Sequence, residues 1–395
     1  MKLLWDRHES LDDLVFAYTA GEDALLDDRL VPYDILASSA HAAMLHEAGF
    51  LDGADHAALQ CALSALAQSH RRGAWRVGPG DEDVHTALEN RLVEVAGDAG
   101  KRIHLGRSRN DQVLAALRLW LKDELEGLAQ AAEGLASALR GVGERSGALP
   151  MPGYTHMQRA MPSTVGLWAG AFAAEIDDDA QGLRDAKRRA DKNPLGSAAG
   201  YGVPLLGLDR SHTTTSLGFA CAHEPVTAVQ LSRGKAEACA LFEVALLAQD
   251  MGRLASDLCL FSTAEFGFVR LPPEFTTGSS MLPQKRNPDL FELARGRAAE
   301  SQSALFEVLG VAAKLPSGYN RDLQLTKKPL FRSFDSAGAT AALLAHAVPK
   351  LTFDEARMRA AMEPEMYAAE KAYRLVQESG LPFREAYRQA RQEPI

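Results

Sequence analysis

Apolar residues recur at intervals of three and four along several long stretches of the chain, which is the spacing of one face of an α-helix. The stretch Asp111–Arg140 would form a helix about 45 Å long at ~1.5 Å per residue, which is too long for a small domain. We expect further long helices over residues 162–192, 225–261, 288–314 and 330–346. The apolar stripe of the first helix consists of Leu114, Leu117, Leu121, Leu125, Leu128, Ala132, Leu135 and Leu139.

Shorter helices are expected on both sides of the long ones. The pattern predicts them over residues 27–48, 55–69 and 82–96, and again from Thr352 onward. The alternation typical of strands is nearly absent. The sequence therefore predicts an all-α fold of three domains, over residues 1–104, 105–348 and 349–395, with the long helices bundled in the second. Because these helices carry more apolar face than one chain can cover, we expect a homo-oligomer.

Composition and charge narrow the class of protein. The chain has 395 residues, 46% of them hydrophobic, which is enough for a large core. The net charge of −9 argues against nucleic acid and anionic membranes as partners, so a site for an anion must be locally basic. Four scattered cysteines predict buried free thiols in a reducing compartment. With no apolar run of membrane-spanning length and no signal-like start, we expect a cytoplasmic protein.

The most informative loop is Thr277–Asp289, which reads Thr-Gly-Ser-Ser-Met-Leu-Pro-Gln-Lys-Arg-Asn-Pro-Asp. Its glycine and two serines suit a mobile segment, and Lys285 and Arg286 add two cations. The residues that follow have the order of a helix start, with Asn287 as the N-cap and Pro288 at the first helical position. Such a loop can hold a carboxylate or a phosphate. A plain polar surface loop before a helix has the same composition.

Four further clusters gather polar side chains near the ends of predicted helices. Residues 106–112 read Gly-Arg-Ser-Arg-Asn-Asp-Gln, and residues 82–89 read Glu-Asp-Val-His-Thr-Ala-Leu-Glu. Residues 151–160 contain His156, which can titrate near neutral pH, and residues 315–327 form a polar stretch between two helices. Each cluster also has a structural interpretation, as a capped helix, a satisfied histidine or surface ion pairs. None shows the spacing of metal ligands.

These clusters resemble, in the same order, the signature regions of the fumarase/aspartase superfamily. The loop fits the superfamily pattern Gly-Ser-Ser-x-x-x-x-Lys-x-Asn-Pro. Residues 316–327 fit Pro-Ser-x-Tyr-Asn-x-Asp-Leu-Gln-x-x-Lys, which is similar to argininosuccinate lyases in particular. The resemblance implies the three-domain fumarase/aspartase-like fold, with long helices that form the multi-helix core of a homotetramer. It also implies active sites assembled from three subunits, and neither a metal nor an organic cofactor.

The resemblance implies a reaction as well, the cleavage of L-argininosuccinate to L-arginine and fumarate in arginine biosynthesis. Ser279 would remove the Cβ proton, with Lys285 stabilising its alkoxide. His156 would protonate the leaving guanidinium nitrogen, and the opposite assignment of Ser279 and His156 stays open. The family's substrate-binding positions correspond to Thr19, His85, Ser108, Arg109, Asn110, Thr155, Asn287, Tyr319, Gln324 and Lys327.

Four details depart from the family pattern. Thr19 stands where commoner members carry a serine, and Met281-Leu282 reverses the usual order. Residues 232–234 read Ser-Arg-Gly instead of Asp-Arg-Asp, which we expect to loosen a local ion-pair network. We expect a C-terminal domain that is reduced relative to the family. Two other functions are compatible with this scaffold. Tyr319, Gln324 and Lys327 argue against a lyase for another succinyl substrate, and the intact loop and His156 argue against a non-catalytic structural protein like some lens crystallins.

Overall fold

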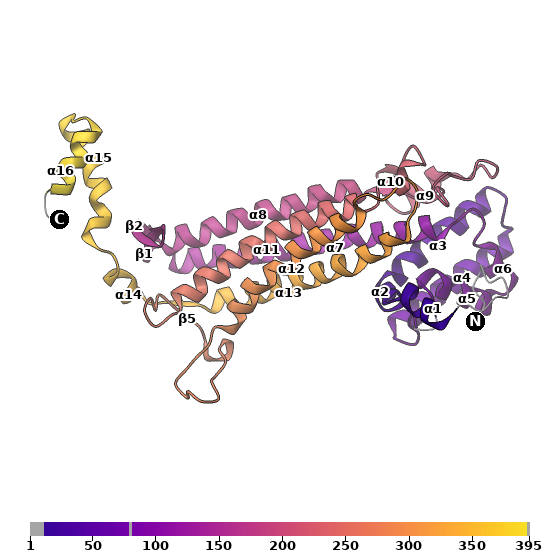
Figure 1. The fold of residues 1–395 in the computed structure, drawn as a ribbon, viewed down its shortest axis with the longest axis horizontal. Coiled ribbons are helices and arrows are strands. Elements are labelled where there is room, and N and C mark those ends of the chain that lie inside the picture. The colour runs from indigo at the N-terminus through magenta and orange to yellow at the C-terminus, as the bar shows by residue number, and fades with distance from the viewer. Residues whose placement is uncertain (1–11, 79–80, 393–395) are drawn as a thin grey trace. The chain divides into compact units, whose positions relative to one another are not determined.

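Helices make up nearly all of the regular structure (Figure 1). The structure is a computed structural model that describes residues 12–78 and 81–392. Contacts between residues divide the chain into two compact units. Unit 1 comprises the described residues of 1–127, 183–243 and 302–334, and unit 2 those of 128–182, 244–301 and 335–395.

The five longest helices each contribute residues to both units. The predicted apolar stripe of the first one is buried from Leu114 to Leu139, which confirms the spacing argument. In unit 1, Trp120 packs edge-on against Phe331, with ring centroids 4.5 Å apart. In unit 2, the indole N–H of Trp168 donates a 2.9 Å hydrogen bond to Asp257. The long helices are α7 (Arg109–Ser146), α8 (Val165–Ala190), α11 (Lys235–Phe261), α12 (Asp289–Ala312) and α13 (Lys327–Ala347).

Unit 1 also contains a set of shorter helices. Asp83 caps one of them, because its carboxylate accepts the N–H of Thr86 at 2.8 Å. The short helices are α1 (Asp13–Ala20), α2 (Asp23–Asp27), α3 (Val31–Glu47), α4 (Gly53–Arg71), α5 (Val84–Ala96), α6 (Asp98–Arg102), α9 (Arg210–Ser216) and α10 (Ala228–Leu231), with 3₁₀ turns η1 (Asp28–Leu30) and η3 (Arg321–Thr326). Strands β3 (Lys192–Asn193) and β4 (Cys221–Ala222) form one short parallel pair.

Unit 2 contains an antiparallel hairpin between the end of α7 and the start of α8, made of β1 (Pro150–Thr155) and β2 (Gln158–Thr164). A helix was predicted from residue 162, but β2 continues to Thr164 and α8 begins at Val165, so this part of the prediction was wrong. Prolines and a glycine interrupt the residue alternation that marks a strand. Two glycines close the base of the hairpin. The N–H of Gly166 donates to the carbonyl of Gly147 at 3.2 Å, and a Cβ on Gly166 would lie 3.0 Å from the Gly147 Cα.

The remaining elements of unit 2 come after α11 or after α13 in the sequence. Strand β5 (Val269–Arg270) pairs with β6 (Thr352–Phe353). The two C-terminal helices α15 and α16 pack through Ala372, Ala386 and Ala390. The other elements are η2 (Pro273–Phe275), η4 (Val348–Lys350), α14 (Glu355–Ala360), η5 (Pro364–Tyr367), α15 (Ala368–Ser379) and α16 (Phe383–Gln392). No helix within the described ranges is long and apolar enough to cross a membrane.

The predicted helix over residues 225–261 is interrupted. It consists of α10, a turn at residues 232–234 and α11. Gly234 has φ +81°, a left-handed conformation that favours glycine, and a Cβ there would lie 2.8 Å from the Cβ of Ala312. Ser232, the other departure from the family pattern, accepts a 2.8 Å hydrogen bond from the buried Arg118. The Ser-Arg-Gly sequence thus fits the turn between α10 and α11, and this turn interrupts the predicted helix.

The prediction of buried thiols was also wrong. All four cysteines are free, but Cys61 and Cys221 are exposed, and Cys239 and Cys259 are partly buried. Cys61 lies on α4 two residues from both Leu59 and Leu63, which are buried. Because successive helical residues are about 100° apart, a residue two positions from a core residue faces the outer side.

Candidate active site

Unit 1 contains a pocket of about 150 Å³ with charged walls. It is formed by α2, the start of α5, the start of α7, the turn at residues 232–234 and the segment 319–327. Four carboxylates line it, those of Asp23, Asp27, Glu82 and Asp83, together with His85 and with four arginine or lysine side chains, those of Arg109, Arg233, Arg321 and Lys327. A pocket with both signs of charge suits a ligand that itself carries both signs.

Lys327, the first residue of α13, is buried against two carboxylates of α2. Its Nζ lies 2.6 Å from Oδ1 of Asp27 and 2.9 Å from Oδ2 of Asp23. The two acids are four residues apart and therefore share one face of α2. Burial disfavours the ammonium, but the two carboxylates outweigh it and hold the pKa of Lys327 above its ordinary value. Burial raises the pKa of Asp23 as well, even with Lys327 beside it.

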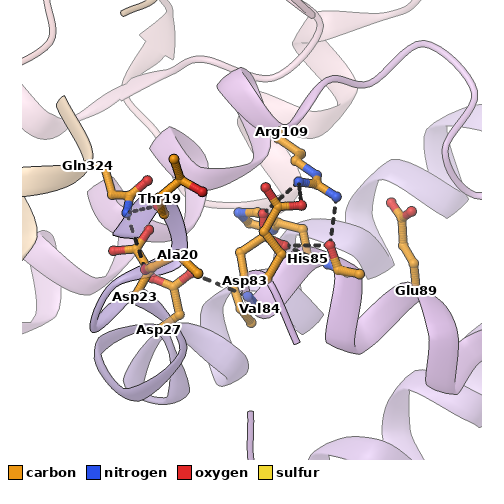
Figure 2. A network of polar contacts seen from close by, with 12 residues as sticks. Thr19, Ala20, Asp23, Asp27, Asp83, Val84, His85, Glu89, Arg109 and Gln324 are labelled. Atoms are coloured by element: carbon orange, nitrogen blue, oxygen red, sulfur yellow. Dashed lines mark hydrogen bonds and ion pairs between the residues drawn. The ribbon is translucent and has the colours of Figure 1, made fainter. Parts of the chain in front are cut away.

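Arg109, the first residue of α7, joins the long helix to the start of α5 (Figure 2). Its guanidinium donates to Glu82 at 2.6 Å and to the Thr86 hydroxyl at 2.8 Å, and lies 3.3 Å from the Asp83 carboxylate. Burial alone would raise the pKa of Asp83, but His85, Arg109 and the Thr86 N–H together lower it. The guanidinium of Arg109 is therefore already paired with carboxylates of the protein itself.

His85 lies on the same turn of α5 and is almost completely buried. Its Nδ1 is 3.1 Å from Oδ2 of Asp34, on α3. Burial lowers the pKa of an imidazole, but Asp34, Asp83 and Asp27 outweigh that effect and raise the pKa of His85 to about 9. His85 is thus an imidazolium at neutral pH, and the carboxylate nearest to it, that of Asp34, belongs to the neighbouring helix α3.

Gln324 and Thr19 meet at the rim of this pocket (Figure 2). The Gln324 amide donates to the carbonyls of Thr19 at 3.0 Å and Ala20 at 3.4 Å, and its oxygen accepts from Arg321 at 3.2 Å. The Thr19 hydroxyl donates within its own helix, to the carbonyl of Val15 at 2.8 Å. The structure therefore places Thr19 beside the pocket, with its main chain rather than its hydroxyl in the contact.

Asn110 and Tyr319 line the pocket directly, and the Tyr319 ring lies 5.7 Å from the guanidinium of the buried Arg233. Ser108 does not line it. The Ser108 hydroxyl accepts the N–H of Asn110 at 3.3 Å, and its own N–H donates to Asp111 at 2.9 Å. Ser108 therefore shapes the start of α7 and holds the neighbouring Asn110 in place.

Thr155 and His156 lie at the tip of the hairpin in unit 2. Thr155 pairs with Gln158, so His156 and Met157 form a two-residue turn with φ +53° and +59°. Both values fit the turn type that best connects twisted antiparallel strands, which usually carries Asn or Gly. Positive φ at a histidine and a methionine is uncommon and tends to occur at functional sites. The hairpin thus presents an exposed His156 on a rigid support.

The loop that carries Ser279 is closed at its base by main-chain pairing. The N–H of Thr277 donates to the carbonyl of Asn287 at 3.2 Å, and the reverse bond is 2.9 Å long. The Ser279 hydroxyl oxygen accepts the N–H groups of Met281 at 3.3 Å and Leu282 at 3.1 Å. This arrangement places two donors on the oxygen that the reaction would use as a base.

The predicted N-cap role of Asn287 was wrong. Helix α12 begins at Asp289, so Asn287 lies before the cap position. Its amide instead donates to the Thr277 hydroxyl at 3.3 Å and to the Gly278 carbonyl at 3.4 Å. The side chain fixes the loop to its own base, while Lys285 is exposed. Main-chain pairing with Thr277 occupies the backbone of Asn287, and the helix begins one residue later than predicted.

The predicted site residues thus fall into two groups, each assembled within one unit. The described residues contain no group of three or more His, Cys, Asp and Glu side chains placed to hold a metal ion. Unit 1 holds Thr19, His85, Ser108, Arg109, Asn110, Tyr319, Gln324 and Lys327, and unit 2 holds Thr155, His156, Ser279, Lys285 and Asn287.

Comparisons with known proteins agree on one family. A model of the lyase family matches residues 11–302. The chain is 46% identical over 390 residues to an argininosuccinate lyase of Sorangium cellulosum, covering 99% of this chain and 90% of the relative. It is 44% identical over 389 residues to an argininosuccinate lyase of Stenotrophomonas maltophilia, covering 98% and 90%. The chain belongs to the argininosuccinate lyase family.

Solved structures of the wider superfamily share the fold. An EDDS lyase in complex with formate has a TM-score of 0.81 at 27% identity, covering 96% of this chain and 75% of that one. A class II fumarase from Schistosoma mansoni has a TM-score of 0.80 at 16% identity, covering 99% and 93%. These likenesses confirm the predicted all-α, fumarase-like fold.

Sequence reasoning missed several residues of the unit 1 pocket. Asp23 and Asp27 show a detectable signal, an i, i+4 pair of acids on a short helix, but such pairs are usually surface residues. Glu82 and Asp83 belong to a cluster that was considered for His85 alone. Arg233 and Arg321 reach the pocket only through tertiary folding, because they lie far in sequence from α2 and α5. Local sequence carries no sign of that proximity.

Proposed function

We propose that this chain cleaves L-argininosuccinate to L-arginine and fumarate by removing the Cβ proton and expelling the guanidinium group. The observation that carries the proposal is the pair of N–H groups on the Ser279 hydroxyl oxygen. A serine is a poor base at its ordinary acidity, and donors that stabilise its alkoxide are what the reaction requires of it. Membership of the argininosuccinate lyase family supports the same reaction.

The other unit 2 residues supply complementary roles. Proton removal next to a carboxylate places extra negative charge on that group, and Lys285 is an exposed cation on the same loop as Ser279. Asn287 would orient the carboxylate from the base of the loop. The departing guanidinium nitrogen needs a proton, which we assign to His156 at the hairpin tip. Thr155, beside it, would contact the substrate.

The unit 1 pocket would bind the arginine end of the substrate. An amino acid carries an ammonium and a carboxylate, and the pocket offers both carboxylates and cations. Asn110 and Tyr319 line the pocket and take no part in its ion pairs, so they are the direct contacts we propose. Lys327, Arg109 and Gln324 are held by their present partners and would set the charge and shape of the pocket. His85, Ser108 and Thr19 would support these three residues.

We further propose a homotetramer in which unit 1 and unit 2 groups of different subunits complete each site. Apolar side chains remain exposed on the long helices, among them Leu167 on α8, Phe242 on α11 and Phe306 on α12. Large exposed apolar surface of this kind marks an interaction face. The three predicted domains would then divide the work, with the central one forming the tetramer core. We place the enzyme in the cytoplasm, where its four free thiols would stay reduced.

The decisive experiment follows fumarate by its ultraviolet absorbance after purified protein is mixed with argininosuccinate. Ser279→Ala should lower kcat by about 10²–10⁴-fold, the range for loss of a general base. Ser280→Ala is the matched control, because it removes the neighbouring hydroxyl of the same loop, and it should retain most of the activity. Near-normal turnover by Ser279→Ala would refute the base assignment, and no fumarate from the folded wild type would refute the reaction.

A further inference from the structure

Unit 2 contains a second cleft, separate from the hairpin tip, at the base of the Ser279 loop. Its volume is about 420 Å³. It is bounded by the end of α11, strand β5, the turn η2, helix α14 and the residues on either side of the loop's base. The twelve lining residues include three arginines, Arg270, Arg286 and Arg357, and no aspartate or glutamate. The cleft is therefore locally basic in a chain whose net charge is −9.

Two of the three guanidiniums are held in place by the protein. Arg270, on β5, pairs with Asp354, which does not line the cleft. Arg357, on α14, donates to the carbonyl of Ala264 at 2.8 Å. It packs against Gly267, where a Cβ would lie 2.5 Å from the Arg357 Nη1 and where φ is +59°. Only glycine fits this position without displacing the guanidinium.

Arg286 differs from the other two. It is exposed on the loop next to Lys285, and within the described residues its side chain has no hydrogen-bond or ion-pair partner. The cleft therefore combines two anchored guanidiniums with one that is available. The lining residues include three cations and no anion, and Asp354 pairs with one of the three, so an excess of positive charge remains inside the cleft.

We propose that this cleft binds a small dianion, of the class of inorganic phosphate or a four-carbon dicarboxylate, between Arg270, Arg286 and Arg357. Guanidinium groups bind carboxylates and phosphates through paired, charge-assisted hydrogen bonds, and clusters of arginine are a common solution for a doubly charged ligand. The unit 1 pocket contrasts with it, because its cations are matched by carboxylates. Occupancy would tie Arg286, and with it the base of the Ser279 loop, to α14.

The first test is calorimetric titration of the full-length protein with inorganic phosphate, against sodium chloride at equal ionic strength. We expect saturable binding to the wild type and about tenfold weaker binding to Arg270→Gln and to Arg286→Gln. Arg140→Gln is the matched control, because Arg140 also forms an exposed ion pair in unit 2, with Asp177, away from this cleft. It should bind phosphate as the wild type does. Arg286→Gln keeps the test informative if the change at Arg270 disturbs β5.

The second test locates the ligand. Trypsin can cleave after the exposed Lys285 and Arg286, and bound dianion should slow that cleavage in the wild type and in Arg140→Gln, but not in Arg270→Gln. Phosphate and fumarate are compared in separate titrations, and the tighter one that depends on Arg270 identifies the source. No phosphate or fumarate binding by the wild type, or binding unchanged in Arg270→Gln, would overturn the proposal. Neither test needs turnover, so an inactive protein that binds phosphate would refute only the proposed reaction.

Discussion

Lys327 and Lys285 show how differently the two units hold their charged side chains. Lys327 is buried, and two carboxylates lie within 2.9 Å of its ammonium. Lys285 is exposed at the end of a loop. The same contrast holds for the two histidines. His85 is enclosed by acids from its own helix and its neighbours, whereas His156 projects from the tip of a two-residue turn.

This difference separates two ways of preparing a site. In unit 1, the charges are matched and oriented before any ligand arrives, so a substrate would enter a preorganised field and move little. In unit 2, the reactive groups have a firm base but open surroundings. Such groups acquire a low-dielectric environment only when another surface covers them. If the proposed sites combine residues of different subunits, the unit 2 groups are those whose surroundings depend on assembly.

The largest expected effect is the activity regained when two inactive variants are refolded together. Asn110→Ala alters unit 1 and Ser279→Ala alters unit 2, and each should reduce turnover, Ser279→Ala by about 10²–10⁴-fold. If sites combine units of different subunits, unfolding the two variants together and refolding the mixture should create some intact sites. Fumarate release from the mixture should then clearly exceed that from either variant refolded alone. Equal activity in all three samples would argue that one chain supplies each whole site.

A second comparison sets stability against catalysis. Lys327→Gln leaves two buried carboxylates without their cation and should lower the free energy of unfolding by about 3–5 kcal/mol. Lys285→Gln removes an exposed charge and should change it by less than about 0.5 kcal/mol, while kcat falls. Denaturant unfolding followed by circular dichroism, with fumarate assays on the same samples, measures both. Similar destabilisation by the two substitutions would remove the distinction between the units.

The buried imidazolium of His85 predicts a particular dependence on pH. The pKa of His85 in the folded protein is about 9, above the value of about 6.5 in an unfolded chain. Its contribution to stability is complete below pH 6.5 and is lost as the pH rises through 9. The loss is on the order of 3 kcal/mol. The difference in unfolding free energy between the wild type and His85→Gln should shrink over this range, and a constant difference would contradict the assignment.

The smallest expected effect concerns the turn at the hairpin tip. Met157 adopts φ +59°, which costs a side-chain-bearing residue roughly 1–2 kcal/mol relative to glycine. Met157→Gly should therefore raise the free energy of unfolding by about 1 kcal/mol. Met161→Gly, in the extended strand β2, is the control and should lower it, since glycine weakens a strand. Destabilisation by both would show that the Met157 side chain makes contacts that outweigh the turn.

The parts of the fold that sequence predicted are those in which local pattern and tertiary packing agree. The α7 stripe is buried at every predicted position, and the helices over residues 27–96 lie close to their predicted ranges. The hairpin was missed because Pro150, Pro152 and Pro162 hide its alternation. The interruption at Gly234 was missed because apolar residues lie on both sides of it, at Val229 and again from Ala236 onward.

The candidate site divides in the same way. The residues that resembled a family signature could be named from local sequence, and the structure places those of unit 1 in or beside one pocket. Their partners could not be named, because the acids around Lys327 come from a segment about 300 residues away. Likewise, only the structure reveals that the side-chain amide of Asn287 bonds to the other side of the loop's base. Sequence thus indicates which groups are reactive, and packing determines what each of them faces.

The closed base of the hairpin gives it a modular character. Gly147 and Gly166 hold the ends of residues 150–164 together through a direct contact of their backbones. The helices on either side are therefore already joined, and the length of the segment between the glycines adds little to the entropy of closing it. Natural or engineered relatives could lengthen, shorten or exchange this segment without rebuilding the helices. The position of the proposed proton donor would then be adjustable on its own, as an insertion in a fixed frame.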